Sequence, residues 1–404
     1  MDQQGRRAGD GVGPRGRVAG TGRASHAGRL LPSKARIQIS IGMLLPGLLV
    51  LGVVGCGDPP ILGDCLPRHG MTPICLFQGP EDLAVVGGWL VVSQMPTSKK
   101  PGSLIAFHPG TATYRSLFPP KGVALGTLPP TSTSNSTSVE NDGAEAVDDG
   151  GCRAGRPPSI DEFAPHGIDV AGTRLLAINH GRREAIEEFV LSADGTGLTL
   201  RWQSCTPLPA DASANDVVAL DDGGFAATKM VERPQWKGIA KLLLGMETGA
   251  LLRYSPKTKT WETVPNTAGR APNGVEVDAE GRFYVAEWTG RRIVRVAADG
   301  SGRETVELDF SPDNLAWSAD GRLLVTGQRA SVLDVPGCAA VEQGTCALPS
   351  VVVAIDPTAF KVYPILDEDP AVVLGAASIA VELDGNLWIG AFAGNRLVRR
   401  EGVR

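Results

Sequence analysis

Four short residue pairs, each with at least one carboxylate or amide side chain, recur along this chain of 404 residues, and each stands directly ahead of an apolar segment. Asn and Asp also favour turns, so a single pair would indicate only a turn cap. Four pairs in equivalent contexts indicate a shared role. Carboxylates mixed with neutral amide oxygens, without His or Cys, suit a hard cation such as Ca²⁺, which takes about 6–8 oxygen ligands. The pairs are Glu81-Asp82, Asn215-Asp216, Asn273-Gly274 and Asp313-Asn314.

Two of the five histidines, His166 and His180, are embedded in the same repeating sequence. His166 comes just before an apolar segment, and His180 directly follows the mostly apolar segment 175–179. A histidine at the end of a strand is more often structural, but its titration near neutrality also suits a general base. His166 and His180 are therefore the candidate catalytic residues.

Short apolar segments bounded by turn residues recur from about residue 80, in a chain with 51 Gly and 30 Pro. Repeats of this size, without convincing amphipathic helices between them, favour propeller blades over a parallel α/β fold. We predict an all-β fold over residues 79–404, a six-bladed β-propeller with a central calcium-containing channel. The six copies centre on residues 89–93, 175–179, 225–228, 283–287, 323–327 and 387–391.

In a propeller, equivalent ends of the innermost strands converge around the central channel. Oxygen ligands that belong to separate blades would therefore meet at one point on that channel. The spacing of the four pairs thus predicts a cation site built by several blades together.

Six short motifs follow one another in the order seen in the paraoxonase/arylesterase family of calcium-dependent lactonases, and the chain resembles that family from roughly residue 79 to its C-terminus. The resemblance implies a six-bladed propeller related to the gluconolactonase-like propellers, with two calcium ions in the channel. It also implies hydrolysis of a small-molecule lactone or of aryl or alkyl esters. The motifs are Gly79-Pro80-Glu81-Asp82-Leu83, Pro165-His166-Gly167-Ile168, Asn179-His180, Asn215-Asp216-Val217, Asn273-Gly274-Val275 and Asp313-Asn314-Leu315.

The resemblance implies a role for each candidate residue. A catalytic calcium would polarise the substrate carbonyl, His166 would take a proton from the attacking water, and His180 would orient His166. The implied ligands of the catalytic calcium are Glu81, Asn215, Asn273, Asp313 and Asn314. The implied ligands of a buried structural calcium are Asp82, Asp216 and the backbone carbonyl of Ile168.

Two departures from the family pattern concern the expected pocket wall. Gln328 stands where a further pocket histidine is expected, and another histidine is replaced near Val231. Two alternatives therefore stay open: a gluconolactonase-type hydrolase of sugar lactones, against which the histidine pair argues, and a non-catalytic propeller that uses calcium for stability and binds a ligand. The sequence has no Gly-x-Ser-x-Gly segment, which disfavours a serine hydrolase.

The first 55 residues have the pattern of an export signal, because basic residues precede an apolar run over residues 41–54. This run is shorter than the roughly 20 residues of a membrane-spanning helix. Cys56 follows small residues as in a bacterial lipobox, so we predict lipidation at Cys56 and a linker over residues 56–78. An ordinary secretory signal is the alternative. Gly57, in place of an Asp after the cysteine, favours the periplasmic face of the outer membrane over the inner membrane.

The net charge gives no indication of a nucleic-acid partner. Without residues 1–55 the chain has 31 basic and 42 acidic residues, a net charge of −11, whereas nucleic-acid binding calls for a basic face. Besides Cys56 there are six cysteines, an even number that favours disulfides in an exported chain. Many pairings are possible; proximity in the sequence favours Cys65–Cys75, Cys338–Cys346 and hence Cys152–Cys205.

Two segments interrupt the strand repeats. Residues 127–151, rich in Thr, Ser, Asn, Asp and Gly, have the composition of a flexible insertion. Residues 236–246 place Trp236, Ile239 and Leu243 at helical spacing. This helix would pack over an end of the propeller, act as a lid, or touch a membrane. The sequence predicts no oligomeric state.

Overall fold

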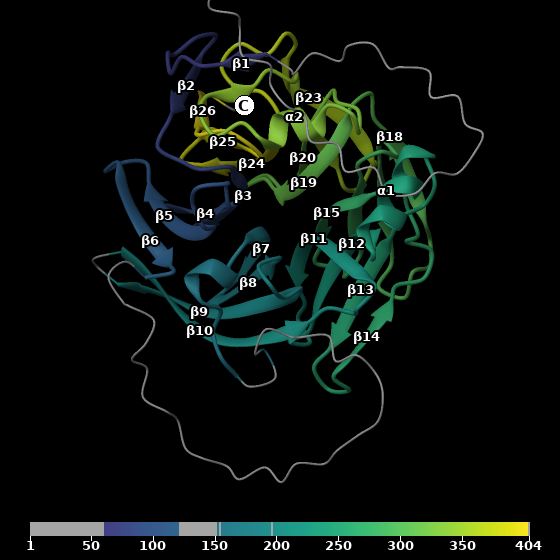
Figure 1. The fold of residues 1–404 in the computed structure, drawn as a ribbon. Coiled ribbons are helices and arrows are strands. Elements are labelled where there is room, and N and C mark those ends of the chain that lie inside the picture. Colours follow the sequence, from purple (N-terminus) through teal and green to yellow (C-terminus); the bar gives the residue numbers. More distant parts are fainter. Residues whose placement is uncertain (1–59, 121–151, 153–154, 195–196, 403–404) are drawn as a thin grey trace, which may run out of the picture. The chain divides into compact units, whose positions relative to one another are not determined.

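Six four-stranded antiparallel sheets form most of the part of the chain that the structure describes. The computed structural model describes residues 60–120, 152, 155–194 and 197–402. Each sheet is one blade, and the innermost strands surround a central channel, so the predicted six-bladed β-propeller is confirmed (Figure 1). The export signal, Cys56 and the insertion at 127–151 lie outside the described residues.

The first five blades follow one another along the chain, and each runs from its inner to its outer strand. The first has β3 (Pro80–Val86), β4 (Trp89–Gln94), β5 (Ser103–His108) and β6 (Thr113–Phe118). The second has β7 (Pro165–Ala171), β8 (Arg174–Asn179), β9 (Ala185–Asp194) and β10 (Gly197–Pro207). The third has β11 (Ala212–Ala219), β12 (Phe225–Glu232), β13 (Ala250–Ser255) and β14 (Thr260–Thr263). The fourth has β15 (Pro272–Val277), β16 (Phe283–Glu287), β17 (Arg292–Val296) and β18 (Glu304–Glu307). The fifth has β19 (Ser311–Trp317), β20 (Leu323–Gln328), β22 (Ser350–Asp356) and β23 (Lys361–Glu368).

The sixth blade joins the two ends of the described chain. Its strands β24 (Ala377–Leu383), β25 (Asn386–Ala391) and β26 (Leu397–Glu401) are completed by β2 (Met71–Ile74), which pairs with β26. The prediction of a linker over 56–78 is therefore wrong for its second half. A four-residue strand that contains Pro73 gives too short a periodic signal to be recognised. A second small sheet pairs β1 (Ile61–Leu62) with β21 (Thr345–Cys346).

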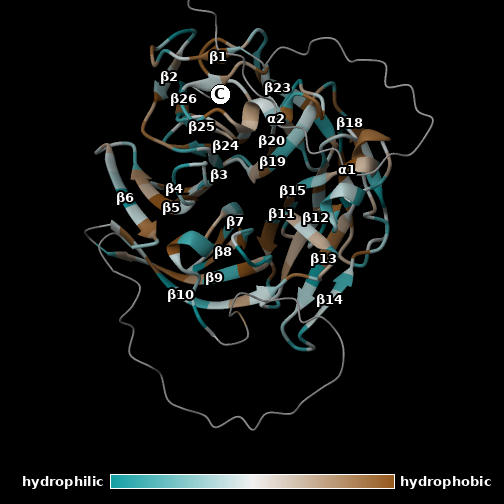
Figure 2. Cartoon of the chain, in the orientation of Figure 1, coloured by the Kyte–Doolittle hydropathy of each residue, from teal (hydrophilic) through white to brown (hydrophobic). Residues whose placement is uncertain are grey.

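Apolar side chains fill the space between neighbouring blades, and Figure 2 shows apolar residues along the strands of each blade. Between the first and second blades, Phe118, Phe163 and Phe189 contact one another edge to face with ring centroids 4.8–6.2 Å apart. Such pairs stabilise a core by about 0.5–1.5 kcal/mol beyond the area that they bury.

The three disulfides have the partners favoured by proximity in the sequence. Cys65 is bonded to Cys75, and Cys152 is bonded to Cys205. Cys338 of the short helix α2 (Val335–Ala339) is bonded to Cys346 of β21. The pairing is therefore confirmed.

The predicted helix is present as α1 (Gln235–Leu243), between β12 and β13, but the apolar side chains of its predicted face are not packed on the propeller. Trp236 is 72% exposed, and Ile239 and Leu243 are also exposed. The helix contacts the blade through Gly238, where a Cβ atom would lie 2.7 Å from the backbone oxygen of Glu232. The expectation of a helix packed by its apolar face is wrong. No helix of the described residues is long and apolar enough to cross a membrane.

Candidate active site

Each innermost strand changes register where it passes the channel, at the place where the predicted residues stand. A β-bulge leaves residues outside the ladder of hydrogen bonds and re-aims their side chains. The pairs that could have been turn caps therefore belong to the strands themselves. The bulged positions hold Glu81, His166 and Gly167, Asn215 and Asp216, Asn273 and Gly274, Asp313 and Asn314, and Ser378.

Six of the predicted residues form one group in the channel, the upper group, with Glu81 at its centre. Its members are Glu81, His166, Asn215, Asn273, Asp313 and Asn314. Glu81 Oε1 accepts a hydrogen bond from Asn314 Nδ2 at 2.7 Å and lies 3.5 Å from His166 Nε2. The same nitrogen of His166 lies 3.4 Å from Asn215 Nδ2. Residues from the first, second, third and fifth blades thus meet within hydrogen-bond range.

Asp313 completes the upper group. It is held by Gln328, a residue that was predicted to line the pocket wall. Burial raises the pKa of Asp313, and the side chain of Asn273 is near enough to offset part of that rise. Gln328, fully buried at 0% exposure, donates from Nε2 to Asp313 Oδ2 and, at 3.0 Å, to the backbone oxygen of Ala377. Its Oε1 accepts from Trp288 Nε1 at 3.0 Å. Gln328 therefore supports Asp313 instead of facing a substrate.

The other residue expected in the pocket wall, Val231, lies at the end of β12. It is half-buried beneath α1, where a Cβ atom at Gly238 would lie 2.9 Å from its own Cβ. Val231 thus packs against the backbone of the helix.

Oxygen atoms without partners gather in the upper group. Native proteins pair the great majority of their buried polar atoms, and an unpaired one costs about 1–3 kcal/mol. The upper group has four buried oxygens without a hydrogen-bond partner, from four different blades, which is too many to be incidental. Among the described residues, those buried side-chain oxygens in the channel that have no hydrogen-bond partner include Glu81 Oε2, Asn215 Oδ1, Asn273 Oδ1 and Asn314 Oδ1.

This donor set fits a calcium ion. Together with Asp313 it offers two carboxylates and three amide oxygens, the hard ligands that Ca²⁺ prefers. Within the part of the chain that the structure describes, no three His, Cys, Asp or Glu side chains form a metal centre by themselves. A cation bound by Glu81 and Asp313 would therefore need the amide oxygens as further ligands.

The electrostatics of the channel also call for a positive charge. Burial, followed by the nearby charge of Glu81, raises the pKa of Asp313 to about 8. Burial and neighbouring carboxylates likewise raise the pKa of Asp82 and that of Asp216 well above their ordinary values. A bound cation would favour the ionised form of all three groups.

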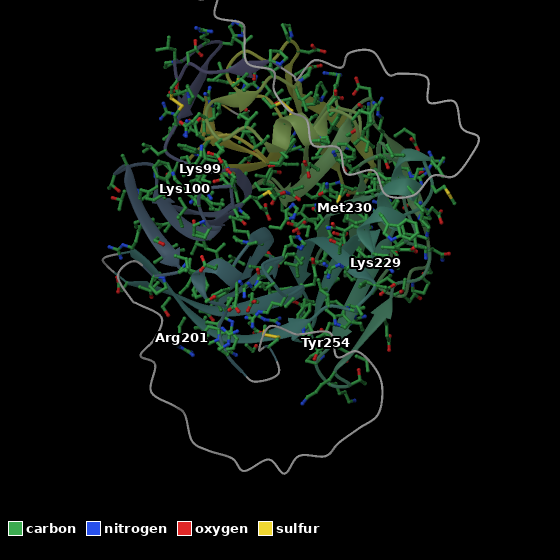
Figure 3. All side chains as sticks on the ribbon, viewed as in Figure 1. Lys99, Lys100, Arg201, Lys229, Met230 and Tyr254 are labelled. Atoms are coloured by element: carbon green, nitrogen blue, oxygen red, sulfur yellow. A yellow bond between two sulfur atoms is a disulfide. The ribbon has the colours of Figure 1, made fainter. Side chains whose placement is uncertain are left out.

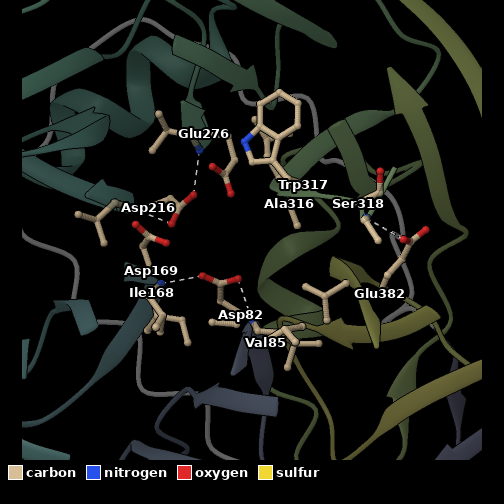
Figure 4. Close-up of a pocket in the computed structure, with 18 residues that line it drawn as sticks. Asp82, Val85, Ile168, Asp169, Asp216, Glu276, Ala316, Trp317, Ser318 and Glu382 are labelled. Atoms are coloured by element: carbon tan, nitrogen blue, oxygen red, sulfur yellow. Dashed lines mark hydrogen bonds between the residues drawn. The ribbon is translucent and has the colours of Figure 1, made fainter. Parts of the chain in front are cut away.

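The predicted ligands of the structural calcium form a second group further along the channel (Figure 4). Asp82 accepts hydrogen bonds from the backbone N–H groups of Ile168 (2.6 Å) and Leu83 (2.8 Å). Asp216 accepts from two further backbone N–H groups, each at 2.8 Å. A Cβ atom at Gly167 would lie 2.4 Å from Asp216 Oδ1, so this close approach requires glycine after His166.

These carboxylates line a cavity of about 420 Å³ that also contains two residues which sequence reasoning missed, Asp169 and Glu276. Figure 4 shows both carboxylates directed toward the same space as Asp82 and Asp216. Burial raises the pKa of Asp169 and that of Glu276. Each lies on an inner strand close behind a predicted residue, which is the signal that could have found them.

The two histidines are hydrogen-bonded to each other and to a carboxylate. His166 Nδ1 lies 3.1 Å from His180 Nε2, and His180 Nδ1 lies 2.8 Å from Glu184 Oε2. Burial opposes the charged form of His166, but the carboxylates of Glu81, Asp313 and Glu184 outweigh it and raise the pKa of His166. Sequence reasoning missed Glu184, although it follows His180 by four residues.

An apolar cluster adjoins the upper group. Met230, which is labelled in Figure 3, joins the two, because its Sδ lies 3.5 Å from Asn215 Nδ2 and its side chain packs on the buried cluster around Trp288. Leu242 of α1 and Val335 of α2 contact the same cluster. The polar oxygens and the histidine are therefore backed on this side by a buried apolar cluster.

The comparisons with known proteins give a short sequence match and distant structural likenesses. No family model matches the chain. The L-arabinolactonase of Azospirillum brasilense is 38% identical over 64 residues, which are 16% of this chain and 21% of that protein. The chain thus matches about a fifth of the length of this curated relative.

Two solved structures of bacterial proteins are similar in outline. A gluconolactonase of Xanthomonas campestris is 16% identical with a TM-score of 0.49, over 85% of this chain and 95% of the other. Virginiamycin B lyase of Staphylococcus aureus is 12% identical with a TM-score of 0.45, over 81% of this chain and 98% of the other.

Proposed function

We propose that this chain is a calcium-dependent hydrolase of lactones or related carboxylic esters. The observation that carries the proposal is the meeting of four unpartnered oxygens with His166 Nε2 in one part of the channel. The oxygens suit a cation, and the histidine beside them suits a general base. Either feature alone would support only a binding site.

The proposed roles follow from the contacts. Calcium bound by Glu81, Asn215, Asn273, Asp313 and Asn314 would act as a Lewis acid toward the substrate carbonyl. His166 Nε2 takes the proton of the attacking water and gives it to the ring oxygen of the lactone when the acyl C–O bond breaks. The Asn215 amide, 3.4 Å from that nitrogen, stabilises negative charge on the substrate oxygen. His180 holds the His166 ring through its bond at 3.1 Å.

A lactone is the substrate class that we favour. The short stretch of similarity to an L-arabinolactonase supports the chemistry of lactone opening. The hydrogen-bonded pair of His166 and His180, which argues against the gluconolactonase type, favours a lactone other than a sugar lactone. A sugar-lactone hydrolase is the second candidate, because the only curated relative named above acts, by its name, on a sugar lactone.

The test uses purified protein that begins at Cys56. Aliphatic lactones, aldonolactones and phenyl acetate are assayed with and without a calcium chelator. We expect turnover of aliphatic lactones that is lost on chelation and lost in His166→Gln, whereas the exposed His69→Gln keeps it. Turnover of aldonolactones alone would favour the second candidate. Calcium binding without turnover of any of these substrates would contradict the proposal.

A further inference from the structure

We propose that Glu184 is a positioning residue that fixes the tautomers of both histidines and so directs the lone pair of His166 Nε2 into the channel. The catalytic meaning of this inference rests on the proposed function, but the hydrogen-bond order can be tested without it. Glu184 lies between β8 and β9, outside the inner strands.

The carboxylate of Glu184 is itself held in place. Its side chain is 12% exposed, its Oε2 lies 2.8 Å from His180 Nδ1, and its Oε1 lies 3.4 Å from Arg233 Nη2 at the base of α1. The preceding chain is tightly packed, since a Cβ atom at Gly181 would lie 2.4 Å from the backbone oxygen of Glu162. The third blade thus helps to position a residue of the second.

The chemistry of the three groups sets the direction of the hydrogen bonds. An ionised carboxylate only accepts, so His180 Nδ1 must carry the hydrogen. In a neutral imidazole the other nitrogen is then an acceptor, and His180 Nε2 accepts from His166 Nδ1. The hydrogen of His166 is consequently on Nδ1, and its Nε2 keeps the lone pair.

The environment of His166 Nε2 agrees with this order. Asn215 Nδ2, 3.4 Å from His166 Nε2, is a hydrogen-bond donor. It is therefore better placed opposite a lone pair on His166 Nε2 than opposite a second N–H group. The neighbouring Glu81 Oε1, at 3.5 Å, already accepts a hydrogen bond from Asn314 at 2.7 Å. The lone pair therefore faces the side chains of Asn215 and Glu81 in the channel, where the substrate would lie under the proposed function.

The test measures the histidine tautomers directly by ¹⁵N NMR of protein labelled at histidine, with signals assigned through His166→Gln and His180→Gln. Glu184→Met removes the acceptor but keeps the length of the side chain, and Glu184→Gln keeps an acceptor oxygen without the charge. Glu188→Met is the matched control, because Glu188 is 22% exposed and pairs with Arg174 at 2.8 Å, away from the channel histidines.

We expect both histidines of the unchanged protein to carry their hydrogen on Nδ1. Glu184→Met should convert a large fraction of His166 to the Nε2–H tautomer, while Glu184→Gln and Glu188→Met keep the original pattern. For lactone hydrolysis, Glu184→Met should lower kcat about tenfold or more with KM and calcium affinity unchanged. If Glu184→Met does not fold, the tautomers of the unchanged protein decide the question.

An Nε2–H tautomer of His166 in the unchanged protein, or the same spectrum in Glu184→Met, would overturn the inference. If no lactone is hydrolysed but the tautomers change as expected, the proposed function fails and the positioning role of Glu184 stands.

Discussion

The unpartnered oxygens of Glu81, Asn215, Asn273 and Asn314 explain why the channel uses amides as much as carboxylates. Burial and mutual repulsion already raise the pKa of Asp313 to about 8, so further carboxylates would make the empty channel still less favourable. An amide contributes an oxygen without adding charge. The sequence predicted these residues through their recurrence ahead of apolar segments, whereas Glu184, which stands alone in a connecting segment, left no repeated pattern to follow.

The charge of Glu81 should dominate the affinity for calcium. Glu81→Gln keeps the shape of the side chain but removes one of the two carboxylates of the group, so we expect calcium affinity to fall about tenfold or more. Isothermal titration calorimetry measures this. Glu188→Gln, which alters a carboxylate outside the channel, should bind calcium normally. Equal affinities of Glu81→Gln and the unchanged protein would argue against Glu81 as a ligand.

Calcium binding should release protons near neutral pH. The pKa of Asp313 is about 8 in the ion-free channel, so this group is largely protonated at about pH 7 and ionises when a cation binds. Its raised pKa means that the apparent calcium affinity falls as the pH drops through about 8. Calorimetry in buffers of different ionisation enthalpy counts the protons released. A binding enthalpy that does not depend on the buffer would contradict this prediction.

At the scale of elements, the sequence predicted the second strand of each blade well, because these strands are short uninterrupted apolar segments. The inner strands were harder to recognise, because a bulge with one or two polar or glycine residues interrupts each and resembles a turn. The helix α1 was predicted from its spacing, but spacing alone did not show that Trp236 and Leu243 would stay exposed. Burial depends on partners that are distant in the sequence.

The strand β2 should stabilise the whole propeller, because it completes the sixth blade. Met71 of β2 is 2% exposed and packs on Leu387 and Val398. We expect Met71→Ala to lower the free energy of unfolding by about 2–5 kcal/mol, the usual cost of a cavity in a core. Leu76→Ala, at a residue 65% exposed, should change it by less than about 0.5 kcal/mol. Chemical denaturation measures both changes in the free energy of unfolding. A loss for Met71→Ala as small as the loss expected for Leu76→Ala would show that β2 adds no packing energy.

At the scale of the molecule, the order of the blades brings residues from 81 to 314 to one point on the channel. The number of repeats predicted this ring. The sequence did not predict which strand closes it, since β2 and β26 stand at opposite ends of the described chain. Ring closure is a non-local pairing, and short strands carry little information about their partners.

The lipobox pattern leads us to propose a lipid anchor at Cys56. Because acylation would occur on this thiol, Cys56→Ala should yield protein that takes up no labelled palmitate and leaves the membrane fraction. Cell fractionation with metabolic palmitate labelling tests this. Labelling of the Cys56→Ala protein at the level of the unchanged protein would contradict the proposal.

The measurement that tests the central claim most directly is a crystal structure of the protein grown with calcium, with the ion identified by its anomalous scattering. We predict one ion within about 2.3–2.6 Å of oxygens from Glu81, Asn215, Asn273, Asp313 and Asn314. A channel in which these oxygens bind only water or protein donors at saturating calcium would contradict the account.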